Sequence, residues 1–323
     1  MKTYNLFIVS SPLQVMNAIE AVEHFKTQNN ILLILSTENT NQLTQMNQLL
    51  TFIDWFRVEY ISPLTYKGIN RFFFPRLISH QLKDIKNYKI DKLFVGDYRS
   101  EHLNHIVNYF QHKDVYLLDD GLNQLSYHKY ILTPSYKLRI RRFIYKAFFY
   151  KLSKVKYTMF TMFTIKNEKV INNNHSFFKK YINTKIIEDK VYFIGQPLVD
   201  LKIMSEENFK KELLKVILFY SKKRFIYILH RKEDGERIKK ISNEFNFEYK
   251  KFNNVIEIEM LNSKKIPSDF ATFFSTAIIT LPSFIKDAKY ITFKSQYFNN
   301  NVVDTIEDIY KEFEERNLKV ESL

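Results

Sequence analysis

The chain has 323 residues, 45% of them apolar, which is enough to build a hydrophobic core in each of two domains. It contains no cysteine, which excludes disulfides and cysteine-based zinc or redox sites and fits a reducing compartment. Its 49 Lys and Arg residues outnumber its 35 Asp and Glu residues, and this net charge of +14 favours an anionic partner.

Short apolar runs alternate along the chain with longer helical patterns. Buried strands are predicted at residues 6–9, 31–35, 92–95 and 115–118, and helices at 13–27 and 100–111. A second series of strands is predicted at 191–194, 225–229 and 255–258, with an amphipathic helix at 304–316. This alternation predicts parallel sheets covered by helices. The polar stretch 167–189 is the expected linker, which divides the chain into domains 1–187 and 188–323.

Positive charge is concentrated in one segment of the first domain. No acidic residue occurs between Asp120 and Glu168, whereas ten Lys or Arg residues do. Within residues 137–156 these basic side chains alternate with Phe and Tyr, a composition typical of helices at a membrane interface. The alternative is that the aromatic side chains pack inside the domain and the charges form a solvated face.

The beginning of the chain predicts neither export nor a membrane anchor. Residues 1–14 enter a strand pattern without a basic leader or a small-residue cleavage site. No stretch approaches the roughly 20 apolar residues that a spanning helix needs. We therefore expect a cytoplasmic protein, either free or peripheral at the inner face of the cytoplasmic membrane.

Ligand-binding residues are expected where the predicted strands end, because loops and helix N-termini converge there. In the first domain these positions hold Ser11, Gln14, Asp97, Asp119, Asp120 and Gly121. In the second domain they hold Gly195, Gln196, Pro197, His230 and Arg231. Three of the five glycines fall at strand ends, where a glycine lets backbone amides approach a phosphate closely.

The type of phosphate ligand is narrowed by the motifs that the sequence lacks. There is no G-x-G-x-x-G for a dinucleotide and no G-x-x-x-x-G-K-[ST] for a P-loop. An Asp-x-Asp sequence, which holds a metal-bound nucleotide in many glycosyltransferases, is also missing. The remaining prediction is a nucleotide site without a metal.

These loops resemble those of bacterial sialyltransferases, most closely glycosyltransferase family 52. The similar motifs are Ser-Pro-Leu-Gln at 11–14, Asp-Asp-Gly at 119–121, Gly-Gln-Pro-Leu at 195–198, His230, the Glu-containing stretch 257–261 and Phe-Phe-Ser-Thr-Ala at 273–277. The resemblance implies a GT-B fold, in which two Rossmann-like lobes face each other across a central cleft. It also implies CMP-sialic acid as donor, inversion at the anomeric carbon, and no metal or other cofactor. The family usually has Pro after the histidine, whereas Arg231 follows His230 here and would add a phosphate contact of its own.

Transfer from CMP-sialic acid needs a base for the acceptor hydroxyl and a partner for the departing phosphate. Asp119 and Asp120 are candidate bases because adjacent carboxylates raise the pKa of one of them; an Asp-Gly turn is the alternative. Asp200 is a rival base by its place after Gly195 in the family pattern, with helix capping as the alternative. His230 is the candidate phosphate ligand or acid, unless it is merely a solvent-facing side chain at a strand end.

Further donor contacts are predicted beyond these loops. Glu257 and Glu259 alternate along the predicted strand and should face the same side, so one of them, preferably Glu259, would bind the ribose hydroxyls. Exposed carboxylates at a sheet edge are the alternative. Ser275 and Thr276 offer hydroxyl donors for phosphate or carboxylate oxygens, a role compatible with capping a helix.

The expected substrate is a terminal galactoside of a surface glycan, either lipooligosaccharide or capsule. A GT-B enzyme with a different nucleotide-sugar donor remains an alternative. A nucleic-acid-binding protein is suggested by the charge and the 16% aromatic content, but no reader motif supports nucleic acid as a partner. The sequence leaves the acceptor, the linkage and the oligomeric state open, a homodimer included.

Overall fold

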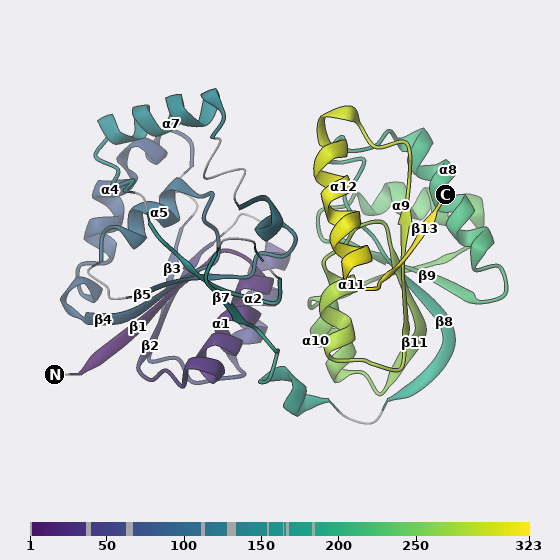
Figure 1. Cartoon of the computed structure of the whole chain (residues 1–323), viewed down its shortest axis with the longest axis horizontal. Coiled ribbons are helices and arrows are strands. Elements are labelled where there is room, and N and C mark those ends of the chain that lie inside the picture. The colour runs from purple at the N-terminus through teal and green to yellow at the C-terminus, as the bar shows by residue number, and fades with distance from the viewer. Residues whose placement is uncertain are drawn as a thin grey trace. The chain divides into compact units, whose positions relative to one another are not determined.

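The computed structural model describes residues 2–36, 40–62, 67–110, 114–127, 134–153, 155–163, 165, 168–182 and 185–323. The chain divides into two compact units, Met1–Phe177 (unit 1) and Phe178–Leu323 (unit 2) (Figure 1). Strand β8 (Ile186–Ile194) spans the predicted boundary between residues 187 and 188. Of the basic residues noted above, Lys129, Lys154 and Lys166 lie outside the described residues.

Unit 1 contains a seven-stranded parallel sheet with the order β3-β2-β1-β4-β5-β6-β7. Its strands are β1 (Thr3–Val9), β2 (Asn30–Leu35), β3 (Arg57–Ile61), β4 (Lys89–Val95), β5 (Asp114–Leu118), β6 (Thr158–Thr161) and β7 (Val170–Asn172). The four strands predicted in this unit are confirmed as β1, β2, β4 and β5. Every residue of β2 is buried, the pattern of a parallel strand covered on both faces.

Helices pack around this sheet. They are α1 (Pro12–Phe25), α2 (Thr40–Leu50), α4 (Asn70–Gln81), α5 (Glu101–Val107) and α7 (Tyr136–Ala147). Helix α1 begins after Ser11, whose hydroxyl accepts a hydrogen bond from the backbone N–H of Gln14 at 3.3 Å, and Pro12 occupies its first turn. It ends at Lys26 in the left-handed conformation. The helices predicted at 13–27 and 100–111 are confirmed as α1 and α5, although α5 ends at Val107 and residue 111 lies outside the described residues.

Unit 2 contains a six-stranded parallel sheet with the order β10-β9-β8-β11-β12-β13. The strands besides β8 are β9 (Arg224–Leu229), β10 (Glu248–Lys251), β11 (Lys265–Thr272), β12 (Lys289–Lys294) and β13 (Lys319–Ser322). The helices are α8 (Glu206–Phe219), α9 (Gly235–Phe245), α10 (Ile256–Asn262), α11 (Ala277–Thr280) and α12 (Asn300–Glu315). The predicted strands 191–194 and 225–229 and the predicted helix 304–316 are confirmed. Within the described residues, no helix is both long and apolar enough to cross a membrane.

The strand predicted at residues 255–258 is wrong, because this segment is the start of helix α10. Its alternation of Ile and Glu imitates a half-buried strand, but Ile256, Glu257 and Ile258 are all buried in succession. The strand that pairs with β8 at this point of the fold is instead β11. Its sequence mixes Pro, Ser and Asp with apolar residues and therefore gives no continuous apolar run.

Candidate active site

Gln14 connects three loops at the carboxyl edge of the unit 1 sheet. Its Oε1 atom accepts hydrogen bonds from the backbone N–H of Ser10 at 2.7 Å and from the Ser10 hydroxyl at 3.2 Å. Its Nε2 atom donates to Oδ1 of Asp120 at 2.8 Å. Gly96 leaves room for this side chain, because a Cβ atom there would lie 2.2 Å from Gln14 Oε1. Gly96 therefore admits a side chain, a different role from the predicted approach of backbone amides to a phosphate.

The two predicted bases have different surroundings. Asp119 is 3% exposed, and its carboxylate accepts hydrogen bonds from the Thr161 hydroxyl and, at 3.0 Å, from the backbone N–H of Met162. The Asp120 side chain is 14% exposed and projects toward Gln14 and Arg99. Asp119 thus ties β5 to β6, whereas Asp120 is the more accessible carboxylate.

Arg99 is a site residue to which sequence reasoning gave no role. Its guanidinium binds Oδ2 of Asp120 at 2.8 Å and Oδ1 of Asp97 at 3.0 Å, and its backbone N–H donates to the same Asp97 oxygen at 2.8 Å. Burial lowers the pKa of Arg99, but the neighbouring charges of Asp97 and Asp120 raise this pKa by more, so it lies above its ordinary value. Gly121, the residue after Asp120, has a φ of 66°, which a glycine adopts without strain. Asp97 therefore positions Arg99, and Arg99 fixes the orientation of Asp120.

In unit 2, the loop after β8 is joined to the loop after β11. Gln196 accepts, at Oε1, the backbone N–H of Phe274 at 2.8 Å and the Thr272 hydroxyl at 3.2 Å. Pro197 begins the following turn, where its carbonyl accepts the N–H of Leu201 at 2.9 Å. The two loops are therefore held together at the carboxyl edge of the sheet.

Glu233 is the second site residue that the sequence did not reveal. Its Oε1 accepts from the Tyr227 hydroxyl and its Oε2 from the backbone N–H of His230, both at 2.6 Å. A Cβ atom on Gly195 would lie 2.5 Å from Glu233 Oε2 and 2.5 Å from the Tyr227 ring, so only a glycine fits beneath this carboxyl group. Burial raises the pKa of Glu233 from 4.5 to about 7, against the opposing effect of its two hydrogen bonds.

The same carboxyl group fixes the loop that carries His230. The Nδ1 atom of His230 accepts a hydrogen bond from the backbone N–H of Lys232 at 3.1 Å, which assigns the ring proton to Nε2. Burial, followed by the positive charges of Arg231 and Lys232, lowers the pKa of His230 to about 4. At neutral pH this side chain is therefore an uncharged hydrogen-bond donor, and the positive charge at this strand end comes from Arg231 and Lys232.

The rival base Asp200 forms an ion pair with Arg237 of α9. Its side chain is 24% exposed and that of Arg237 is 13% exposed. The negative charge of Asp200 is one of the influences that raise the pKa of Glu233. Asp200 thus belongs to the network around the β8 and β9 strand ends.

Glu257 and Glu259 do not share a face as predicted, because residues two apart on a helix point to opposite sides. Glu257 is buried and accepts a hydrogen bond from the Thr280 hydroxyl at 2.5 Å, and burial raises its pKa despite the opposing charge of Arg231. Glu259 is half-buried and accepts the backbone N–H of Asn254 at 2.8 Å. Both carboxylates therefore have structural partners in and around α10.

Ser275 and Thr276 lie in the loop between β11 and α11. The Ser275 hydroxyl accepts the backbone N–H of Ala277 at 3.3 Å, as expected for a residue that caps a helix. Thr276 is the N-cap residue of α11. In the part of the chain that the structure describes, no three His, Asp or Glu side chains gather as a set of metal ligands.

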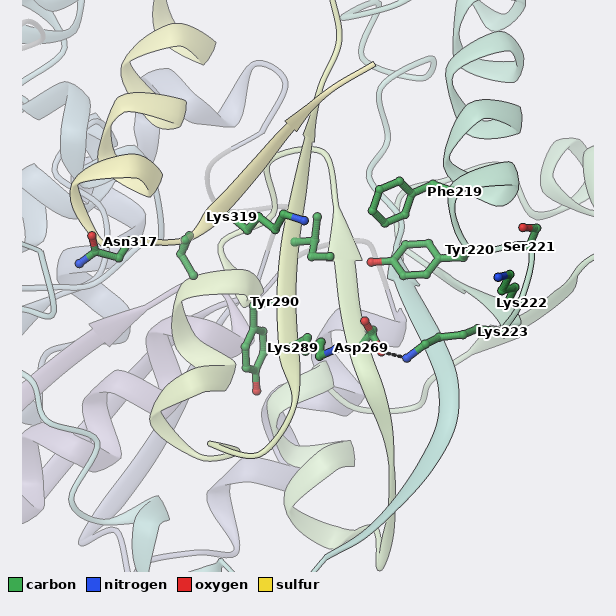
Figure 2. Close-up of a pocket in the computed structure, with 12 residues that line it drawn as sticks. Phe219, Tyr220, Ser221, Lys222, Lys223, Asp269, Lys289, Tyr290, Asn317 and Lys319 are labelled. Carbon is green, nitrogen blue, oxygen red and sulfur yellow. Dashed lines mark hydrogen bonds and ion pairs between the residues drawn. The ribbon is translucent and has the colours of Figure 1, made fainter.

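A hollow of about 660 Å³ in unit 2 lies away from these loops (Figure 2). Its walls include Lys289 and Lys319, the first residues of β12 and β13, and Phe219 at the end of α8. The ion pair between Lys223 and Asp269 crosses one side of it. Because ligands of parallel sheets bind at the carboxyl ends of strands, this hollow at the amino ends is not part of the candidate site.

The chain is similar in sequence to a curated bacterial protein. Over 233 residues the chain is 28% identical to an N-acetyllactosaminide alpha-2,3-sialyltransferase of Haemophilus influenzae, a match that covers 68% of this chain and 70% of that protein. No protein-family model matches the chain. This similarity is to a bacterial sialyltransferase, as the loop motifs predicted.

Solved structures show the fold. A UDP-N-acetylglucosamine 2-epimerase matches with a TM-score of 0.54 and 13% identity, covering 98% of this chain and 87% of its own. The protein TcCGT1 in complex with UDP matches with a TM-score of 0.52 and 10% identity. A spinosyn rhamnosyltransferase with thymidine diphosphate matches with a TM-score of 0.50 and 7% identity. Each match covers 100% of this chain and 86% of the other chain. The chain is thus similar in sequence to a bacterial sialyltransferase and has the GT-B fold, which confirms the predicted Rossmann-like lobes and supports the predicted glycosyltransferase class.

Proposed function

We propose that this chain is an inverting, metal-independent sialyltransferase. It transfers sialic acid from CMP-sialic acid to a terminal galactoside of lipooligosaccharide or capsule. The observation that carries the proposal is the loop after β9, where the neutral His230 presents an Nε2–H donor beside the charged Arg231. The sialyltransferase activity of the Haemophilus influenzae relative supports the donor and the class of acceptor.

The proposed reaction is a single displacement. An acceptor hydroxyl oxygen bonds to the anomeric carbon of sialic acid while the bond from that carbon to the CMP phosphate breaks, so the configuration inverts. The hydroxyl proton passes to a carboxylate, and the phosphate leaves with the bonding electrons. Hydrogen bonds and positive charge from His230 and Arg231 stabilise that phosphate as its charge develops.

We assign the base to Asp120, because its carboxylate is the more accessible of the adjacent pair. Arg99 and Gln14 each hold one of its oxygens, so the carboxylate has a fixed orientation. Asp119 is assigned a positioning role through its bonds to β6. Asp200 inherits the base role if neither member of the pair affects turnover.

On the donor side, the proposal assigns the phosphate to the loops that follow β8, β9 and β11. Gly195, Gln196 and Pro197 form the first of these loops, and Ser275 and Thr276 contribute hydroxyl donors from the third. A ribose contact is kept for Glu259, since Glu257 is enclosed by Thr280. No metal is required, because the neutral His230 and the charged Arg231 meet the phosphate directly.

Mass spectrometry of reactions with lactose as acceptor tests the proposal. CMP-sialic acid, UDP-galactose and UDP-N-acetylglucosamine are offered separately to the purified chain, and we expect a sialylated product and released CMP only from the first. Release of UDP without any release of CMP would favour the second candidate, a GT-B transferase with another donor. That candidate is kept because proteins of this fold have been solved with UDP and thymidine diphosphate.

We also propose that the enzyme works at the inner face of the cytoplasmic membrane, with peripheral contact through residues 137–156. In support, α7 buries only Leu138 and Tyr145 of the side chains described there. An acceptor attached to a lipid would be presented at that surface.

A further inference from the structure

Helix α7 packs against the rest of unit 1 along one narrow side. Leu138 and Tyr145 are buried beneath it, and Arg141 forms an ion pair with Glu101 of α5 at 2.7 Å. Its remaining face is exposed and rich in large apolar side chains. These are Tyr136, Ile140, Phe143 and Ile144, with Phe148 and Phe149 immediately after the helix. Phe143 is 76% exposed and Phe149 is 86% exposed, values that are unusual for phenylalanine in a folded protein.

Helix α4 presents a second exposed apolar face, which the sequence did not indicate. Ile69, just before the helix, is 73% exposed, and Phe73 and Leu77 within it are exposed as well. Their spacing of four residues places Ile69, Phe73 and Leu77 along one side of the helix. The buried side of α4 is formed by Phe74 and Ile78.

The two helices form one continuous surface, which we call the α4–α7 surface. The rings of Phe72 and Phe148 lie 4.8 Å apart, and the Tyr150 hydroxyl donates to the Arg71 carbonyl at 2.5 Å. Between the helices lies a groove of about 600 Å³. Its aromatic lining comes from Phe72 and Phe73 of α4, from Phe148 and Phe149 just after α7, and from Tyr109, with Arg76 and Lys151 among its polar residues. In Figure 1, α7 lies at one end of unit 1 next to α4.

Charge on this surface has a single sign. The sequence has no acidic residue from 60 to 83 or from 121 to 167, the two stretches that contain α4 and α7. Exposed basic side chains stand among the apolar ones: Arg71, Arg76, Lys137, Arg139 and Lys146. Apolar side chains ringed by cations match the chemistry of an anionic lipid surface, in which acyl chains lie beneath negative headgroups.

Phe149 adds a local argument for an apolar partner. Its φ of 64° lies in the left-handed region, which is strained for a side chain of this size. This backbone conformation holds an aromatic ring almost fully in solvent at the mouth of the groove. Strain that exposes an apolar ring points to a partner that covers the ring.

We propose that the α4–α7 surface docks unit 1 on an anionic phospholipid bilayer. Phe143 and Phe149 enter the acyl region, the groove receives the apolar part of a lipid, and the basic side chains bind headgroup phosphates. This proposal rests on the proposed function in one respect, which is that the enzyme works at a membrane. To the predicted contact through residues 137–156 it adds helix α4, the groove and the class of lipid.

Flotation of the purified full chain with vesicles tests the docking surface without any nucleotide sugar. We expect binding to vesicles of equal parts phosphatidylcholine and phosphatidylglycerol, weak binding to phosphatidylcholine alone, and release by salt. Changing Lys137, Arg139 and Lys146 together to Gln should weaken binding about a hundredfold, since each basic side chain near an anionic surface contributes about fivefold. A matched control changes three exposed lysines of unit 2 to Gln: Lys222, Lys240 and Lys250.

The insertion of side chains into the lipid is measured separately. Because the chain has no native cysteine, a single introduced cysteine is the one site that a thiol-reactive dye labels. Phe143→Cys and Leu218→Cys each receive an environment-sensitive dye; Leu218 is a matched position on α8 that is 62% exposed. Anionic vesicles should shift the emission to the blue at position 143 and leave position 218 unchanged. Phe149→Gly removes the ring at a φ that glycine favours and should weaken vesicle binding at least about tenfold without loss of folding.

Equal binding to neutral and anionic vesicles, or equal loss in the triple variant and its control, would overturn the proposal. So would tight, salt-sensitive binding to random DNA without vesicle binding, which would make nucleic acid the occupant. These readings involve no glycosyl transfer. Failure of the transferase proposal therefore leaves them intact, and a chain that transfers sialic acid without binding vesicles refutes the docking surface alone.

Discussion

Glu233 gives the sharpest quantitative test of the unit 2 site. Its carboxyl group packs against Gly195, accepts hydrogen bonds from Tyr227 and His230, and has a pKa raised by burial from 4.5 to about 7. The folded state therefore retains a proton that the unfolded chain releases once the pH exceeds about 4.5. Replacing Glu233 by Gln removes this ionisation and keeps the shape of the side chain.

The sign and the size of the effect follow from that difference. A carboxyl group with a raised folded pKa contributes stability that is fully present below pH 4.5 and is lost as the pH rises to about 7. The difference between the two pKa values, at about 1.4 kcal/mol per pH unit, gives a total loss of at most about 3.5 kcal/mol. From pH 4.5 to 8 the wild-type chain should therefore lose up to about 3 kcal/mol relative to Glu233→Gln.

Urea denaturation of both proteins at several pH values measures this difference. The comparison cancels the buried histidines, whose own titration is common to both chains. Glu236→Gln is the matched control, because Glu236 lies three residues further on, in the first turn of α9, with its side chain 79% exposed; the stability of this variant should follow that of the wild type. Parallel curves for wild type and Glu233→Gln across this range would show that Glu233 is ionised in the folded state, and the reasoning would fail.

Four further predictions concern the site. Asp120→Asn should reduce turnover by about a hundredfold or more with CMP binding retained, whereas Asp119→Asn should chiefly lower the melting temperature; unchanged turnover in both would exclude the pair as base. His230→Ala should reduce kcat about a hundredfold, more than it raises the donor KM, and adding Arg231→Ala should reduce kcat further. A double variant that transfers sialic acid at the wild-type rate would remove this loop from the donor site. Gly96→Ala should lower turnover more than stability, because the added methyl group displaces the glutamine that orients Asp120; activity equal to wild type would contradict that link. Activity should survive EDTA, and a complete loss restored by manganese would refute the metal-free proposal.

The predicted strands that the structure confirms share one property, which is a run of at least three consecutive apolar residues. Such runs arise because both faces of a central parallel strand are buried, as in β1 and β2. Edge strands lack that signal: β10 reads Glu-Tyr-Lys-Lys and is exposed along its whole length. Its place in the sheet is set by pairing with β9, which local sequence patterns do not encode.

The error at α10 has a different origin. A short Ile-Glu-Ile-Glu alternation has the period of a strand, and seven residues are too few for a helical period to stand out. A local contact supports the helix. The Glu259 carboxylate accepts the backbone N–H of Asn254 at 2.8 Å and so caps the start of the helix. Tertiary burial of Glu257 against Thr280 completes a helix that alternation alone does not predict.

The candidate site residues at strand ends could be proposed from the sequence because strand ends are predictable once the strands are. Arg99 and Glu233 were not identified, since each stands in a charged stretch that reads as solvated surface. Each gains its role from a contact with a residue that is distant in the chain. Arg99 contacts Asp120, and Glu233 contacts Gly195. A charge pattern along the sequence does not contain that information.

The scarce glycines offer a way to recover part of it. Gly96 and Gly195 follow β4 and β8, the strands next to β1 and β9 in their respective sheets, and each admits a functional side chain into the space that a Cβ atom would fill. In unit 1 that side chain is Gln14, which leads to Asp120, and in unit 2 it is Glu233, which leads to His230. A glycine directly after a buried parallel strand therefore predicts a polar side chain from a neighbouring loop or helix start, as well as a backbone approach to a phosphate. In this chain the two glycines mark the two networks that orient the proposed base and the proposed phosphate ligand.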